Sequence, residues 1–132
     1  MRKLFGNVDL RGRPVVRIGR ADGGDDFLAV VDTGFNGELL VSSEDVPRIG
    51  VAASRVVATV ELAGGLLQDV EQAKIEIMWM GRSRLVDIFI GIEPAVRKST
   101  DEPIALIGTG LLRPHLMLID FQSGTVEIER QD

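Results

Sequence analysis

The sequence predicts an all-β domain of roughly eight short strands, with at most one or two short helical turns. Fifteen glycines among 132 residues fall between short apolar segments rather than inside long ones, which is how turns separate strands. From Val70 to Trp79, polar and apolar side chains alternate, and a period of two residues indicates a strand rather than a helix. Because 132 residues suit one compact core, we expect a single domain covering residues 1–132.

Strands are predicted wherever a short apolar segment is bounded by turn residues. In chain order they cover residues 14–18, 27–31, 39–41, 56–62, 66–80, 85–90, 104–107, 116–121 and 126–128. Residues 27–31 form a continuous apolar run that ends abruptly at Asp32, as in a strand that is buried on both faces. Gly64 and Gly65 follow Ala63 between two of these strands, and this spacing predicts a hairpin.

The remaining segments are predicted to be turns and loops. Ser, Glu and Asp in residues 42–46 favour a helix N-terminus, so we expect one helical turn that stops near Pro47 and Gly50. Residues 93–103 are expected to be a polar loop. The glycine-containing turn at 122–124 joins the last two strands into a second hairpin.

Composition excludes several kinds of chemistry. The chain has no cysteine, which rules out disulfides, cysteine-ligated zinc and a cysteine nucleophile. His115 is the single histidine and no Gly-x-Ser-x-Gly turn is present, so neither a zinc enzyme nor a serine triad is expected. Carboxylates are plentiful, so any catalysis is expected to use them, without a metal or cofactor.

Charge and hydropathy limit the partners and the compartment. The net charge of −5 argues against nucleic acid, whose phosphates need clustered cations. No apolar run is long enough to cross a bilayer, and the first ten residues lack the apolar segment of a signal peptide. We therefore expect a soluble, cytoplasmic protein without a membrane or nucleic-acid partner.

The stretch around Asp32 carries the strongest chemical signal. A buried apolar strand delivers this carboxylate onto a glycine-containing turn, with the Thr33 hydroxyl beside it and Gly34 next. Backbone N–H groups of such a turn can hold a carboxylate ionised and rigid. Residues 105–112 repeat the pattern of an apolar strand entering a glycine turn, but without a carboxylate. Because both segments occur in this sequence, Asp-Thr-Gly is a more specific indication of a functional site than the tripeptide would be alone.

With these features the sequence resembles the retropepsin-like aspartic proteases, in particular their bacterial single-domain members. The resemblance rests on the Asp-Thr-Gly loop at 31–34, a flap-like hairpin at 56–77, Trp79, the strand at 85–90, the glycine motif at 104–112, and 118–121. It implies a small closed β-barrel of duplicated half-units and an active site made by two chains, because each chain has one Asp-Thr-Gly. Thr109 and Gly110 depart from the retroviral pattern, which has Arg followed by Asn or Asp.

The resemblance also implies a mechanism and roles for individual residues. Asp32 of two chains would share one proton, so that one carboxylate activates a water and the other carboxyl donates to the peptide carbonyl. Thr33 would brace the loop and Gly34 would let the backbone approach. Gly64 and Gly65, at the hairpin tip, would close over a peptide or protein substrate. The expected protein is a homodimeric aspartic peptidase.

Other interpretations of the same residues remain open. Asp32 could simply cap its own turn, and Gly64 and Gly65 could form only a tight turn. The chain could be a retropepsin-fold dimerisation or peptide-binding module with little or no turnover, or a small β-sandwich binding domain in which the motif is accidental. The intact Asp32-Thr33-Gly34 favours the enzyme, since a binding module has no need of that carboxylate.

Four further features are interpreted structurally. Trp79 is expected in the core, and His115 at the surface or hydrogen-bonded within the core. The acidic cluster of Asp22, Asp25 and Asp26 does not have EF-hand spacing and is expected to be a solvated turn. One group of basic residues is too small to bind nucleic acid and is expected at solvated strand ends: Arg82 and Arg84 with Arg97 and Lys98.

Overall fold

The computed structural model describes residues 3–50, 56–61, 63–91 and 102–131. Within them the chain forms ten strands: β1 (Lys3–Val8), β2 (Pro14–Arg20), β3 (Phe27–Val31), β4 (Leu39–Ser42), β5 (Val56–Glu61), β6 (Leu67–Trp79), β7 (Arg82–Gly91), β8 (Ala105–Ile107), β9 (His115–Asp120) and β10 (Thr125–Arg130). The helical segments described are short: the 3₁₀ turns Ser43–Asp45 and Ala63–Gly65, α1 (Val46–Ile49) and α2 (Thr109–Leu112). The predicted all-β class is confirmed.

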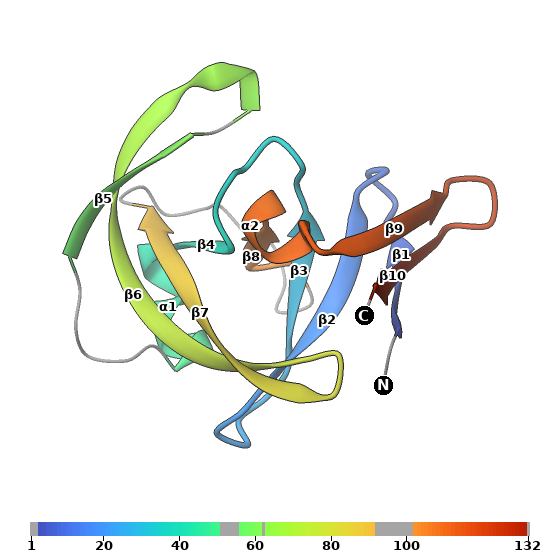
Figure 1. Cartoon of the computed structure of the whole chain (residues 1–132), viewed down its shortest axis with the longest axis horizontal. Helices are drawn as coiled ribbons and strands as arrows, with labels where there is room; N and C mark the ends of the chain where they lie inside the picture. The colour runs from blue at the N-terminus through green and yellow to red at the C-terminus, as the bar shows by residue number, and fades with distance from the viewer. Residues whose placement is uncertain (1–2, 51–55, 62, 92–101, 132) are drawn as a thin grey trace.

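Six of the strands close into a barrel (Figure 1). Neighbouring strands pair in the order β6-β7-β4-β8-β3-β2, and β2 pairs back to β6 through Gly19 with Met78 and Arg20 with Ile77. The pairs β3–β8 and β4–β7 are parallel, and the other pairs of the ring are antiparallel. The predicted small closed β-barrel is therefore confirmed, and its sheet is mixed.

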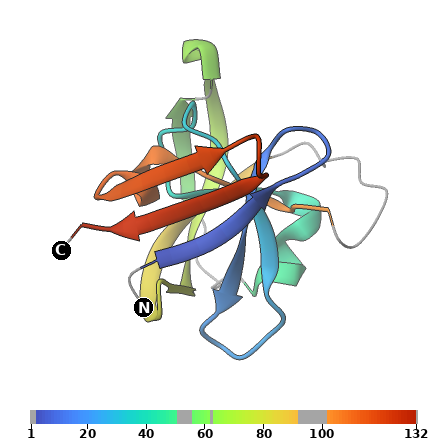
Figure 2. The same ribbon diagram turned by 90° about the vertical axis from the view of Figure 1, so that its right-hand side faces the viewer.

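Two extensions leave this barrel. The hairpin of β5 and β6 projects beyond it, and both views show the hairpin tip above the loop between β3 and β4 (Figures 1 and 2). On the other side, β1 pairs with β2 and is followed by β10 and β9, so that β9 is the last strand of the sheet. In the order of strands across the sheet, the β5–β6 hairpin therefore lies at one end and the three-stranded extension of β1, β10 and β9 lies at the other.

Apolar side chains fill the barrel because alternate residues of every strand point inward. The most enclosed include Ile18, Ile77, Ile88 and Ile107, each at most 1% exposed. Trp79 is 4% exposed and belongs to this core, as predicted. Its indole N–H donates to Nε2 of His115 at 3.1 Å, which agrees with the prediction of a hydrogen-bonded histidine.

A second, smaller apolar cluster lies outside the main core. It is built on Phe35, Val60 and Val70, which are at most 3% exposed, with partly buried Leu40, Ala58, Phe89 and Leu106 packed against it. Phe35 belongs to the loop after β3, and Val60 and Val70 belong to the projecting hairpin. This cluster therefore ties the hairpin to the Asp32 loop.

The structure corrects two details of the sequence prediction. Residues 3–8, for which no strand is predicted, form β1, because β10 and β2 supply backbone partners on both sides. Pro47 does not end the helical turn but lies in the first turn of α1, where a missing N–H costs no hydrogen bond. Gly50 ends that helix as predicted, with a left-handed φ of 75°.

The predicted polar segments are only partly described. The carboxylate of Asp22 accepts hydrogen bonds from the Arg20 guanidinium and from the N–H of Gly24, so that side chain belongs to a local turn. Most of the loop predicted at 93–103, with Arg97 and Lys98, lies outside the described residues. No described helix is long and apolar enough to cross a membrane.

Candidate active site

Asp32 directly follows β3 and is held by two sets of backbone hydrogen bonds. Its N–H donates to the carbonyl of Ile107 at 2.8 Å, which continues the parallel pairing of β3 with β8. Its Oδ1 accepts a hydrogen bond from the N–H of Gly34 at 2.9 Å, and its carbonyl accepts one from Phe35 at 3.2 Å. The carboxylate is thus oriented by its own turn. Asp32 is half-buried, whereas Thr33 and Gly34 are exposed.

Phe35 anchors the far side of this turn. Its side chain is 0% exposed and meets Phe89 edge to face, with ring centroids 6.0 Å apart and planes at 89°. Its carbonyl accepts hydrogen bonds from the backbone N–H of Thr109 at 2.8 Å and from the Thr109 hydroxyl at 3.3 Å. The buried ring of Phe35, three residues after Asp32, therefore anchors the loop to the protein interior. In the sequence, the feature that could have indicated this role is a large aromatic residue within a turn.

The second glycine motif lies directly against the Asp32 loop. A Cβ on Gly108 would lie 2.3 Å from the carbonyl oxygen of Gly37 and 2.5 Å from that of Phe35. No side chain fits there, so Gly108 permits the close approach of the two loops. The N–H of Gly110 then donates to the Gly37 carbonyl at 3.0 Å. The two motifs that the sequence pairs are thus packed together, and residues 108–110 support the Asp32 loop.

The flap-like hairpin is joined to the same loop close to its tip, at the last residue of β5. Asn36 N–H donates to the carbonyl of Glu61 at 3.4 Å, and Glu61 N–H donates to Oδ1 of Asn36 at 3.3 Å. Sequence reasoning missed Asn36, since an asparagine in a turn usually indicates only local turn chemistry. Gly64 and Gly65 lie exposed at the hairpin tip, each with a positive φ.

A row of apolar side chains crosses the outer surface of the barrel near Asp32. Strand pairing places Val30 beside Leu106, Leu106 beside Leu40, and Leu40 beside Phe89. Side chains two residues apart on a strand share a face, and Asp32 lies two residues after Val30. The carboxylate therefore emerges on the side of the sheet that carries this row.

A cavity of about 400 Å³ opens on that row. Its lining includes Val30, Leu40 and Leu106, with Gln68 from the hairpin and Pro103 and Arg13 at its edge. Strands β2 and β3 pair antiparallel from Ile18 with Phe27 to Val15 with Val30, so Arg13, which precedes β2, lies toward the same end of β3 as Asp32. The cavity can receive an apolar side chain, and its lining residue Val30 lies two residues before Asp32 in the chain.

Comparison with known proteins supports the same class of fold. No protein-family model and no curated protein sequence matches the chain. Among solved structures, a retropepsin-like aspartic protease from Rickettsia conorii superposes with a TM-score of 0.65 at 14% identity, over 97% of this chain and 90% of that one. The EIAV protease complexed with the inhibitor HBY-793 gives a TM-score of 0.55 at 16% identity, over 80% of this chain and 89% of that one.

These similarities establish that the chain has a retropepsin-like fold, as the sequence resemblance implied. At 14–16% identity they show the fold alone. What the chain does must therefore be argued from its own residues.

Proposed function

We propose that the chain is an aspartic peptidase that acts as a homodimer and hydrolyses peptide bonds with water activated by two Asp32 carboxyls. The observation that carries the proposal is the Asp32 loop on a retropepsin-like barrel. Its carboxylate is half-buried, oriented by Gly34 and supported from behind by the turn at Gly108. A solvated surface turn would not need this second layer of support.

The chemistry follows from bringing two such carboxyls together. Two carboxyls a few ångströms apart share one proton, because the second negative charge is costly beside the first. The ionised Asp32 takes a proton from water as the water attacks the peptide carbonyl carbon. The protonated Asp32 of the other chain donates to the carbonyl oxygen, and the tetrahedral intermediate collapses with protonation of the leaving amine. Gly34 N–H, bonded to Oδ1, keeps the ionised carboxylate in place.

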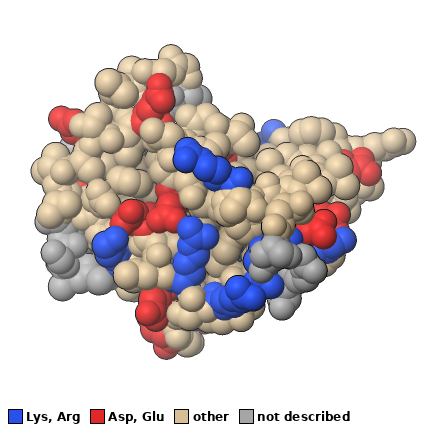
Figure 3. Space-filling model, viewed as in Figure 1, with Lys and Arg blue, Asp and Glu red and all other residues tan. Residues whose placement is uncertain are grey.

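The second copy is expected because each chain supplies one such carboxyl. Thr33 and Gly34 are exposed in the single chain, as residues beside a two-fold axis would be. The extension formed by β1, β10 and β9 adds a surface for a second copy, since Leu116 and Leu118 are 57% and 61% exposed on one face of β9. Figure 3 shows that uncharged atoms dominate the part of the surface over β9 and its following turn.

Substrate would lie between the Asp32 loop and the projecting hairpin. The 400 Å³ cavity with Val30, Leu40 and Leu106 suits an apolar side chain next to the bond that is cleaved. Gly64 and Gly65 stand at the exposed tip, with exposed Leu66 and Leu67 beside them. Closure of this tip over a peptide would cover the apolar residues and exclude water.

The test compares Asp32→Asn with a matched control, Asp25→Asn, an exposed carboxylate of the 21–26 turn. On a broad peptide library at mildly acidic pH, we expect Asp32→Asn to lose about 10²–10⁴-fold in rate, and Asp25→Asn to retain the wild-type rate. A statine-type peptide, whose hydroxyl replaces the attacking water, should raise the melting temperature of the wild type.

Two outcomes would contradict the proposal. Unchanged cleavage by Asp32→Asn would show that Asp32 is not the catalytic group. A folded, dimeric wild type that cleaves no member of the library would instead favour a dimerisation or peptide-binding module of the same fold.

A further inference from the structure

A second cavity, of about 580 Å³, shares Arg13 and Pro103 in its lining with the one described above. Phe5, Leu28 and Pro103 contribute apolar lining, and the turn between β1 and β2 forms its rim. Three arginines from β2 and this turn also line it: Arg11, Arg13 and Arg17. An apolar wall next to several guanidinium groups suits a ligand that has both a methylene stem and a negative charge.

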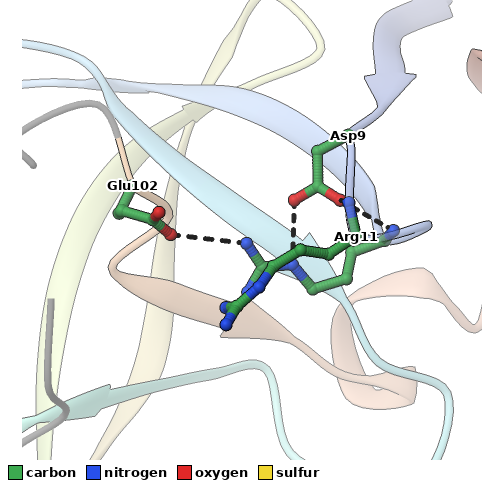
Figure 4. Close-up of polar contacts among 4 residues, drawn as sticks. Asp9, Arg11 and Glu102 are labelled. Atoms are coloured by element: carbon green, nitrogen blue, oxygen red, sulfur yellow. Dashed lines mark hydrogen bonds and ion pairs between the residues drawn. The ribbon is translucent and has the colours of Figure 1, made fainter. Parts of the chain in front are cut away.

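The two acidic side chains that line this cavity are both bound to Arg13. Arg13 Nε donates to Oδ2 of Asp9 at 2.8 Å, and its Nη2 lies 3.4 Å from Oε2 of Glu102. Oδ1 of Asp9 also accepts hydrogen bonds from the backbone N–H groups of Arg11 and Arg13, both at 2.9 Å. Figure 4 shows Asp9 and Glu102 on opposite sides of this contact. The charge of Arg13 is therefore neutralised within the protein.

The ionised state of Asp9 persists in weakly acidic solution. Desolvation raises the pKa of Asp9, but the hydrogen bonds from the backbone and side chain of Arg13 outweigh it and bring the pKa below its ordinary value. Asp9 thus stays charged and keeps Arg13 engaged at the mildly acidic pH at which an aspartic peptidase is expected to work. Arg13 then forms a fixed wall between the two cavities.

Arg11 and Arg17 are in a different situation. Both are exposed, and neither has a carboxylate within 4.0 Å among the described residues. In Figure 4 the Arg11 side chain extends from the turn toward the side on which Glu102 lies. The lining of the cavity has three arginines and two carboxylates, a net charge of +1, and Arg11 and Arg17 are the two arginines that form no ion pair among the described residues.

The two cavities are neighbours, since Arg13 and Pro103 line both of them. One cavity lies beside the apolar row next to Asp32, and the other continues from Arg13 to Arg17 along β2. Four residues of strand span roughly 13 Å, and an extended peptide covers that length in about four residues. A peptide with its cleaved bond at Asp32 would thus place a side chain about three or four residues away in the second cavity.

We propose that the second cavity is a specificity subsite for a glutamate side chain of the peptide substrate. Arg11 and Arg17 bind its carboxylate, and Phe5, Leu28 and Pro103 pack against its methylenes. The inference rests on the proposed peptidase function, because it places the cleaved bond at Asp32. It makes the preferred substrate an apolar residue at the cleaved bond with a glutamate about three or four residues away.

The test uses N-acetylated, C-amidated peptides, so that the side chain supplies the carboxylate under study. A parent peptide cleaved by the wild type is prepared with Glu, Gln or Lys at each position from two to four residues on either side of the bond. At one such position, we expect kcat/KM for Glu to exceed that for Gln by about five- to tenfold at low salt. Lys should be the poorest substrate, and the Glu preference should weaken with added salt.

The double variant R11Q/R17Q should reduce the Glu-to-Gln ratio of kcat/KM to about one. Its matched control is Arg82→Gln, which removes an exposed arginine on β7 that does not line this cavity. The control should keep the full ratio. A ratio near one in the wild type, or a ratio that R11Q/R17Q leaves unchanged, would overturn the subsite while the peptidase function stands.

A second measurement separates the two proposals. Fluorescence polarisation with labelled Glu and Gln peptides reports binding to Asp32→Asn, which is not turned over. Tighter binding of the Glu peptide that R11Q/R17Q abolishes would support the cavity as a glutamate site even if the wild type cleaves nothing. Equal binding of both peptides, or no binding of either, would overturn it.

Discussion

The tight packing of Gly108 against the Asp32 loop predicts that Gly108→Ala destabilises the protein. The added Cβ would stand 2.3 Å from the carbonyl oxygen of Gly37 and 2.5 Å from that of Phe35. Both oxygens already accept hydrogen bonds, from Gly110 at 3.0 Å and from Thr109 at 2.8 Å. Neither can retreat without stretching these bonds, so the two loops must separate.

The expected loss in the free energy of unfolding can be estimated from these contacts. Overpacking of a tight site costs about 1–3 kcal/mol, and weakening two backbone hydrogen bonds adds about 1 kcal/mol each. We expect the free energy of unfolding of Gly108→Ala to fall by about 3–5 kcal/mol, which lowers the melting temperature of a domain of this size by roughly 10–20 °C. Peptidase activity should fall as well, because the displaced loop carries Asp32.

The assay is thermal unfolding followed by far-ultraviolet circular dichroism, with Gly91→Ala as the matched control. A Cβ on Gly91 would meet Val41 at 3.6 Å, an ordinary contact, so its stability should change by no more than about 0.5 kcal/mol. If Gly108→Ala melts within about 2 °C of the control, the tight packing of the two loops and its role in supporting Asp32 are refuted.

Three further predictions test other parts of the structure. Phe35→Ala, which empties a fully buried site against Phe89, should lower the free energy of unfolding by about 3–5 kcal/mol in urea titrations. Leu118→Glu replaces an exposed leucine by a second carboxylate beside Glu127, the cross-strand partner of Leu118, and should shift sedimentation from dimer to monomer without lowering the monomer's stability. Since the folded pKa of Asp9 lies below its ordinary value of 3.8, its stabilisation is present above that pH and is lost below it. Asp9→Asn should therefore be less stable than wild type at neutral pH, and the difference should shrink as the pH falls below about 4.

Local patterns in the sequence determined the fold class and the place of the candidate site. The alternation from Val70 to Trp79 specifies a strand by itself, because neighbouring side chains on a strand face opposite sides. The apolar run at 27–31 specifies β3 and places Asp32 at its end. Gly64 and Gly65 specify the turn of the projecting hairpin. Each of these features depends on residues that are close together in the chain.

Only the tertiary structure decided which distant segments meet. The segment 3–8 has no decisive pattern of its own and becomes β1 because its ladder partners lie at 125–129, at the other end of the chain. Barrel closure through Gly19 and Met78 likewise joins residues far apart in sequence. Such pairings depend on register and long-range packing, which a local window of sequence does not contain.

The candidate site divides in the same way. The sequence by itself identified Asp32, Thr33 and Gly34, because a carboxylate on a glycine turn after a buried strand is a local pattern. The roles of Gly108 and Asn36 and the arginine-lined cavity at Arg11 and Arg17 emerged only from the fold. The reason is physical: close approach of two backbones and the charge of a cavity are properties of segments brought together in space, and no single segment encodes them.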